Sequence, residues 1–140
     1  MKTISISRPY RVRPFVLDRE TAPAYWMAGS LWYITATGSQ TDNLFTMLEQ
    51  QMPQGPGPAS HAHPVDEGFY IIEGQITFSA GGDTVTLGPG GFLHIPRFCE
   101  HTFHIDTKAS TVLNYYMPPG SENIVMSLAR TSCITNDAQF

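Results

Sequence analysis

The 140-residue sequence has little charge, and that charge is scattered. Asp, Glu, Lys and Arg make up 14% of the chain, with eight basic residues and a net charge of −4. No run of Lys and Arg occurs, and the nearest approach to a basic cluster is the loose group Arg8, Arg11 and Arg13. Nucleic-acid-binding proteins carry a basic patch, because neutralising phosphates supplies much of their affinity. The composition therefore argues against a nucleic-acid partner.

Long apolar runs and an export signal are also missing. The apolar stretches are only a few residues long, far short of the roughly 20 that cross a bilayer. The segment from Met1 to Pro9 has no apolar core of the kind found in signal peptides. We therefore expect no membrane span and a cytoplasmic location. In that compartment the two cysteines, Cys99 and Cys133, are expected to remain free thiols.

Turn-forming residues divide the chain into short segments. It contains 12 Gly and 11 Pro, and the stretches between them are rich in β-branched and aromatic residues. This pattern favours an all-β sandwich or barrel that forms one domain over 1–140. Ala80–Asp83 has the glycines of a tight hairpin. The expected strands include 31–35, 44–48, 68–72, 75–78, 84–87, 102–105 and 110–116.

A single short helix is expected near the C-terminus. The stretch 121–130 begins with Ser121, a residue that often caps the N-terminus of a helix. Ile124, Val125 and Leu128 would then form its apolar stripe.

The clearest chemical signal is the stretch His61-Ala62-His63-Pro64-Val65-Asp66-Glu67. If it is extended, His61 and His63 project to the same side, and Glu67 points back to them after a turn at Pro64. Two imidazoles and a carboxylate suit Fe, Ni, Mn, Co, Cu or Zn, with coordination positions left open. His101, which follows a turn after Pro96, is our choice of fourth ligand.

The other polar residues nearby have simpler explanations. Asp66 is adjacent to Glu67 and so faces the opposite way in a strand. Arg97 is interpreted as a solvated loop residue, although it would also suit a substrate anion. His94 and His104 are expected to be structural or surface residues, because isolated histidines usually are. Cys99 is expected to be a packing residue.

These motifs resemble those of the cupin superfamily. Gly55, His61, His63, Glu67 and Gly74 match the first cupin motif at every spacing. In the second motif Gly90, Pro96 and His101 match, whereas Phe98 replaces a Gly and Ile105 an Asn. The resemblance implies a single-domain double-stranded β-helix, or jelly-roll barrel, whose motifs lie within 55–105. It also implies one divalent metal bound by His61, His63, Glu67 and His101.

Within the cupins, the segments 55–63 and 66–74 most resemble the quercetinase-like (quercetin 2,3-dioxygenase-like) group. The resemblance implies a dioxygenase that acts on an aromatic or enol-containing small molecule, with Glu67 as a catalytic base. Two alternatives remain open. One is a non-oxidative metal-dependent isomerase, cyclase, decarboxylase or lyase, and the other is a binding module without turnover.

We also predict the walls of the pocket and an assembly. Alternation from Glu67 and His101 places Phe69, Ile71 and Phe103 in an apolar pocket that would suit an apolar or aromatic ligand. Strand edges in the range Met1 to Arg13 would pair with a second copy, which favours a homodimer. Three further wall residues are expected on other strands: Tyr33, Tyr115 and Met117.

Overall fold

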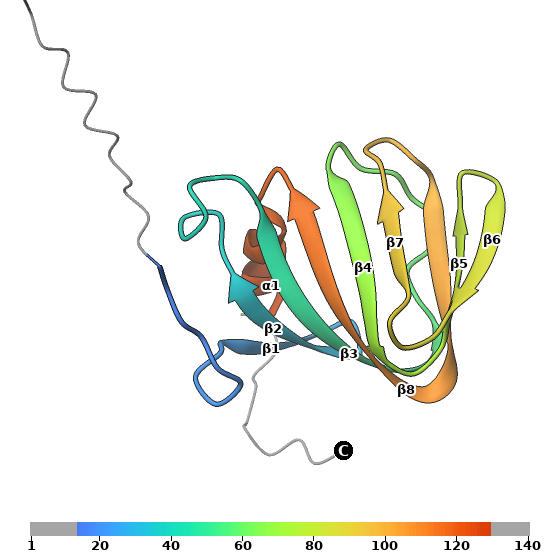
Figure 1. The fold of residues 1–140 in the computed structure, drawn as a ribbon, viewed down its shortest axis with the longest axis horizontal. Coiled ribbons are helices and arrows are strands. Elements are labelled where there is room, and N and C mark those ends of the chain that lie inside the picture. The colour runs from blue at the N-terminus through green and yellow to red at the C-terminus, as the bar shows by residue number, and fades with distance from the viewer. Residues whose placement is uncertain (1–13, 130–140) are drawn as a thin grey trace, which may run out of the picture.

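Eight antiparallel strands and one helix make up the part of the chain that the computed structural model describes, residues 14–129 (Figure 1). The predicted all-β fold with one short C-terminal helix is confirmed. The predicted pairing of Met1 to Arg13 and the state of Cys133 lie outside the described residues. The elements are β1 (Ala24–Met27), β2 (Ser30–Ala36), β3 (Thr46–Pro56), β4 (Asp66–Glu73), β5 (Ile76–Ala80), β6 (Asp83–Leu87), β7 (Phe92–Ile95), β8 (His101–Met117) and α1 (Ser121–Ala129).

The long strand β8 joins the two halves of the fold. The strand order is β1-β2-β3-β8-β4-β7, and β5 pairs with both β6 and β8. The first part of β8 pairs with β5, from His101 opposite Ala80 to Ile105 opposite Ile76. Its last part pairs with β4, and β3 runs beside both parts. Figure 1 shows that β8 bends sharply between these two parts.

Irregularities in the pairing allow the sheet to curve. The register between β3 and β8 shifts between Pro53 and Gly55, and Gly55 has a φ of 131°, which side chains rarely tolerate. A second shift lies in β4 between Ile71 and Glu73. The predicted hairpin at Ala80–Asp83 is present between β5 and β6. The sheet therefore closes around an interior instead of remaining flat.

The interior is filled by side chains from alternate positions of the strands. Phe69, Phe78 and Phe103 pack with their ring centroids 5.1 to 5.8 Å apart. Burying one such side chain stabilises the fold by about 1.5–3 kcal/mol. The buried residues of this main core are Met52, Phe69, Ile71, Ile76, Phe78, Ile95, Phe103, Ile105 and Val112.

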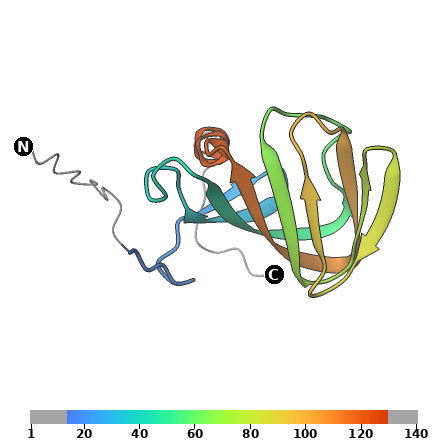
Figure 2. The ribbon, with the colours of Figure 1, turned by 45° about the horizontal axis from the view of Figure 1, so that its top comes forward.

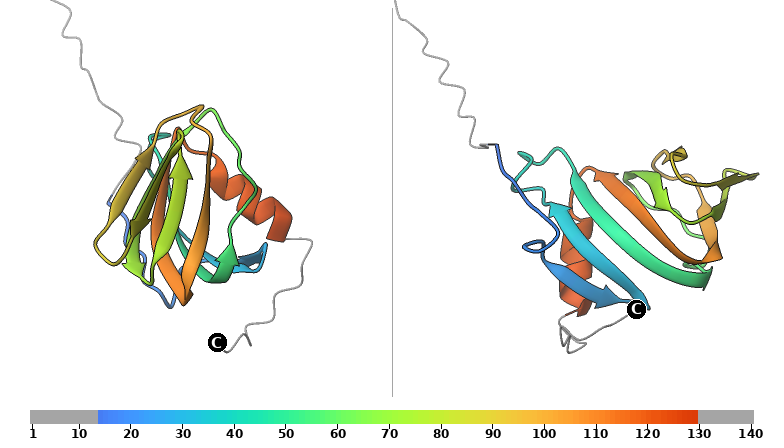
Figure 3. Two further views of the ribbon diagram at one scale, coloured as in Figure 1. Left: turned by 90° about the vertical axis from the view of Figure 1, so that its right-hand side faces the viewer. Right: turned by 60° about the horizontal axis from the view of Figure 1, so that its bottom comes forward.

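Helix α1 covers a smaller core beside β1 to β3, away from β5 and β6 (Figures 2 and 3). Val125 is buried against Ile34 and Leu48. The predicted apolar stripe is only partly correct, because Ile124 and Leu128 are 60% and 53% exposed. No helix among residues 14–129 is long and apolar enough to cross a membrane.

The start of α1 differs from the prediction. The helix begins at Ser121 itself, so Gly120, not the predicted Ser121, takes the capping position. The carbonyl of Gly120 accepts a hydrogen bond from the Asn123 amide (3.0 Å), and the Gly120 amide donates to Oε2 of Glu122 (2.9 Å).

Glu122 fastens α1 to the sheet. Its carboxylate is buried and also accepts hydrogen bonds from the Gly38 amide (2.8 Å) and the Thr46 hydroxyl. Burial alone would raise the pKa of Glu122, but the hydrogen bonds from Gly38, Thr46 and Gly120 outweigh it and lower the pKa below its ordinary 4.5. The charged form is therefore the one that the fold holds.

Glu122→Gln is expected to lower the free energy of unfolding by about 1–3 kcal/mol at neutral pH, because buried donors lose a charged acceptor. The folded carboxyl binds a proton less readily than the unfolded one. Its stabilising effect is thus complete above pH 4.5 and is lost as the pH falls through the lowered pKa. Urea unfolding of both proteins over this pH range measures the effect. The exposed control Glu20→Gln should change little, and an equal effect of the two variants would contradict the prediction.

Candidate metal centre

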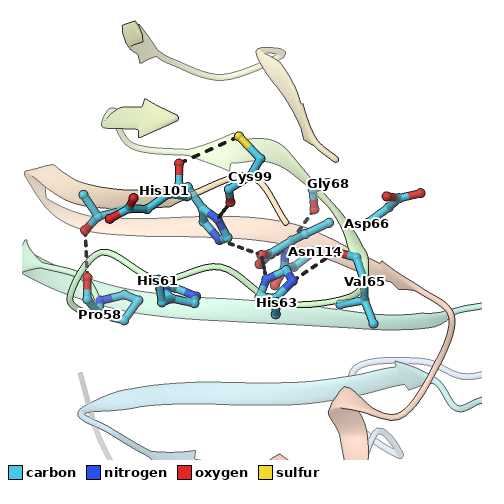
Figure 4. A network of polar contacts seen from close by, with 12 residues as sticks. Pro58, His61, His63, Val65, Asp66, Gly68, Cys99, His101 and Asn114 are labelled. Carbon is cyan, nitrogen blue, oxygen red and sulfur yellow. Dashed lines mark hydrogen bonds and ion pairs between the residues drawn. The ribbon is translucent and has the colours of Figure 1, made fainter. Parts of the chain in front are cut away.

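Three histidines, His61, His63 and His101, lie close together in the structure (Figure 4). His61 and His63 lie between β3 and β4, and His101 is the first residue of β8. One ring nitrogen from each lies within 4.8 Å of the other two. The His-x-His pair lies outside the named strands, because β3 ends at Pro56 and β4 begins at Asp66. Instead, His61 forms an isolated bridge with His101, with N–O distances of 3.1 and 2.9 Å.

The loop before His61 is fixed against the start of β8. The Gly57 amide donates to the carbonyl of Phe103 (2.9 Å), and the Thr102 hydroxyl donates to the carbonyl of Pro58 (2.7 Å). A Cβ atom on Gly57 would lie 2.5 Å from the Phe103 ring, so the close approach requires glycine. The backbone of β8 thereby sets the position of His61.

Local hydrogen bonds set the orientation of each imidazole ring. In all three histidines, Nδ1 lies within hydrogen-bond distance of a backbone carbonyl two residues away. A carbonyl oxygen only accepts, so Nδ1 carries the hydrogen and the neutral ring presents a lone pair at Nε2. Metal-binding histidines commonly have this arrangement. The carbonyls belong to Ala59 (2.9 Å), Val65 (3.0 Å) and Cys99 (2.9 Å).

Glu67, the second residue of β4, lies buried beside these rings. Its Oε2 is 2.8 Å from Nε2 of His63 and 3.1 Å from Nε2 of His101. Its Oε1 accepts a hydrogen bond from Nδ2 of Asn114 (3.2 Å), and the Tyr116 hydroxyl also donates to the carboxylate. Burial raises the pKa of Glu67, but the hydrogen bonds from His101, Tyr116, His63 and Asn114 outweigh it, so the pKa is lowered.

This arrangement brings together more acceptors than donors. With Nδ1 donating to carbonyls, the Nε2 atoms of His63 and His101 are lone pairs that face a carboxylate oxygen. Only a proton or a metal cation between them makes these contacts favourable. The hydrogen bond to Glu67, opposed by burial, accordingly raises the pKa of His101. Three imidazoles and one carboxylate fit a divalent transition metal, as the sequence predicted.

A cavity of about 770 Å³ opens from this centre into the barrel. The volume suits a small organic molecule. Trp32, Leu48, Met52 and other apolar side chains form most of its wall, and Ile124 and Val125 of α1 cover part of it.

The structure brings two of the six predicted wall residues to this cavity, Phe69 and Phe103. Ile71 faces inward but is completely buried in the main core. Tyr33 lies on the outer face and lines a second cavity of about 400 Å³, where the Arg19 guanidinium lies 4.4 Å from its ring centroid.

The remaining two wall predictions are corrected by the register of β8. Tyr116 pairs directly with Glu67 and therefore shares its face of the sheet. Its neighbours Tyr115 and Met117 must face outward. The Tyr115 ring lies over Gly68, where a Cβ atom would be 2.0 Å away, and Met117 is 37% exposed. Sequence reasoning thus missed Tyr116 and Asn114, which face the site.

The other candidate polar residues lie outside the histidine cluster. Asp66 accepts hydrogen bonds from the backbone amide (2.8 Å) and the guanidinium of Arg97, so Arg97 is paired and not simply solvated. His94 hydrogen-bonds to the Tyr115 hydroxyl (2.7 Å), and His104 lies 3.1 Å from Asp106.

Comparison with known proteins places this geometry in a family. The model for the Cupin domain matches residues 47–117. The chain belongs to the cupin family. It is similar to the quercetin 2,3-dioxygenase of Bacillus subtilis (29% identity over 75% of the chain) and to that of Aspergillus japonicus (26% over 94%). The chain spans only 32% and 40% of the lengths of these two relatives.

Solved cupins share its fold. The polyketide cyclase RemF from Streptomyces resistomycificus superposes with a TM-score of 0.64 at 20% identity, covering 75% of this chain and 80% of the cyclase. At this identity the likeness concerns the fold.

Phe98 departs from the cupin motif in side chain but not in backbone. Its φ is 64°, in the left-handed region that glycine favours, although its ring is 70% exposed. Its amide donates to the carbonyl of His63 (2.8 Å), which ties this turn to the cluster. The other departure, Ile105, is buried in the main core.

Phe98→Gly is expected to raise the free energy of unfolding by roughly 0.5–1 kcal/mol, because glycine adopts this φ without strain. Thermal unfolding should show a rise of about 2–4 °C. Phe98→Ala removes the same ring but keeps the Cβ atom, so it should give no comparable gain. A gain of equal size from Ala would contradict the strain argument.

Wild-type protein supplied with divalent metals is expected to retain about one ion per chain, measured by inductively coupled plasma mass spectrometry. His63→Ala should retain roughly a tenth of that or less after dialysis, because a ligand is lost. The matched control His104→Ala, which alters an exposed histidine, should retain the metal. An empty wild type would refute the metal centre.

Proposed function

We propose that this protein is a metal-dependent dioxygenase of the quercetinase type that acts on an aromatic or enol-containing small molecule. One observation carries the proposal. A ring nitrogen from each of three histidines and the Glu67 carboxylate lie together on the wall of a largely apolar cavity of about 770 Å³. His61, His63, Glu67 and His101 would hold the metal. The Bacillus and Aspergillus quercetin 2,3-dioxygenases, at 29% and 26% identity, support the choice of reaction.

A divalent metal bound here would act as a Lewis acid toward an enol or hydroxyl oxygen of the substrate. Glu67 would take the proton from that hydroxyl as a general base. Its lowered pKa keeps it deprotonated at neutral pH and ready to accept. Asn114 holds Oε1, which leaves Oε2 directed at the rings of His63 and His101.

The remainder of the cavity would position the substrate and exclude water. Phe69 and Phe103 offer aromatic surfaces to a planar molecule, and Trp32 offers another on β2. A deprotonated, electron-rich substrate in such a site would be oxidised by O2. In the proposed reaction O2 is the oxidant, both of its atoms enter the substrate, and the substrate loses four electrons.

Metal-loaded wild type is expected to consume O2 when given quercetin, as measured with an oxygen electrode alongside loss of the substrate absorbance. Glu67→Gln should lower the rate by roughly 10²- to 10⁴-fold, because the base is lost. Glu73→Gln, on the exposed end of the same strand, is the matched control and should keep the rate. Metal content is measured in each variant.

The outcomes separate the alternatives. Loss of quercetin without O2 uptake would replace dioxygenation by a non-oxidative metal-dependent reaction. Binding without turnover would leave a ligand-binding cupin. Full activity in Glu67→Gln would remove that residue from the mechanism.

A further inference from the structure

One buried polar side chain in the cavity has no role in the metal centre. Gln50 lies on the inner face of β3, between Leu48 and Met52 in the alternation, and all three line the cavity. Gln50 is only 5% exposed. No hydrogen bond links its side-chain amide to any residue in the range 14–129. Among the described residues only Oδ1 of Asn114 is fully enclosed without a hydrogen-bond partner, so the amide of Gln50 still faces the open cavity, where a polar group of a ligand can pair with it.

Ser30 on β2 shares this property. It is 8% exposed and lines the same cavity, and its hydroxyl has no hydrogen bond within the described part of the chain. Trp32 pairs directly with Gln50, and Ser30 lies two positions before Trp32 on the same face. Ser30 and Gln50 are therefore diagonal neighbours, at a spacing of roughly 7–8 Å between backbones.

Two other polar groups of the cavity wall are already paired. The Gln54 amide donates to the carbonyl of Asp106 (2.9 Å), and the indole of Trp32 donates to the carbonyl of Met27 (3.1 Å). Gln50 and Ser30 are thus distinguished from these neighbours by their free hydrogen-bonding capacity.

The two residues lie well away from the histidine cluster along the sheet. Gln50 pairs with Val112 of β8, whereas Glu67 pairs with Tyr116 of the same strand. Four residues of strand separate the two rows, or roughly 13 Å. A ligand that reaches both must carry polar atoms at two separated positions with an apolar body between them.

We propose that Gln50, assisted by Ser30, is a second polar anchor that selects ligands with a hydroxyl or carbonyl group distant from the oxygen held at the histidines. This inference rests on the proposed function, because it assumes that the cavity binds the substrate. The amide both donates and accepts, so it pairs with a phenolic hydroxyl or a ketone. The selected class is polyoxygenated planar aromatics, not simple enols.

Isothermal titration calorimetry on metal-loaded protein tests the anchor with quercetin and 3-hydroxyflavone. Both carry the same hydroxy-ketone for the metal end, and only quercetin has further ring hydroxyls. Wild type should bind quercetin roughly 10- to 100-fold more tightly. Gln50→Leu should reduce this preference to roughly threefold or less, whereas the control Gln51→Leu, at the neighbouring position on the opposite face of β3, should preserve it. Gln50→Met provides a second variant of similar shape, and circular dichroism checks that each variant folds.

Two results would overturn the anchor. One is the absence of a quercetin preference in wild type, which needs no variant. The other is a preference that persists in Gln50→Leu and Gln50→Met.

The metal end is tested separately with flavone, which lacks the 3-hydroxyl. Equal binding of flavone and 3-hydroxyflavone would refute the proposed function at the histidines, whatever Gln50 does. Failure of all three compounds to bind wild type would overturn both proposals.

Discussion

The curvature of β8 is the constraint on which the site depends. His101 begins this strand and Tyr116 lies near its end, and in a straight strand they would be roughly 50 Å apart. Both nevertheless contact the same carboxylate, Glu67. The strand must therefore bend around the barrel, and Figure 1 shows the bend between its two parts. The bulge at Gly55, on the strand that pairs with both parts, permits that path.

The bend concentrates groups whose electrostatic requirements conflict. A buried carboxylate is costly unless hydrogen bonds or charges compensate it, and Asn114 and Tyr116 supply part of that compensation. Asn114 holds Oε1 of Glu67, while the imidazoles of His63 and His101 lie against Oε2. Since each ring already uses Nδ1 on a carbonyl, the pocket between them is arranged for a cation. The preference of these rings for a cation is therefore set by hydrogen bonds to backbone carbonyls two residues away, and not by packing against distant parts of the chain.

The sequence predicted the parts of this arrangement that depend on local pattern. Motif spacing and the cupin resemblance predict the four candidate ligands, His61, His63, Glu67 and His101. The positions of Gly and Pro, which mark turns, predict most of the strands. What it could not provide was the register between distant strands. A shift of one residue on β8 separates the predicted Tyr115 from Tyr116, which faces Glu67. Likewise 102–105 and 110–116 were expected as two strands, because no local signal shows that one curved strand continues through both.

The residues that would bind the metal and most of the residues that would contact the substrate come from different parts of the fold. The metal ligands lie on a loop and at the starts of β4 and β8, where short contacts to Ala59, Val65 and Cys99 orient them. Much of the wall that would contact the body of a ligand comes from β2, β3 and α1, and Phe69 of β4 and Phe103 of β8 complete it. Substitutions at Gln50 or Trp32 therefore change what the cavity accepts without touching a ligand of the metal. A fold organised in this way can keep one metal chemistry while its substrate changes, because much of the wall lies on β2, β3 and α1, which carry none of the four proposed metal ligands.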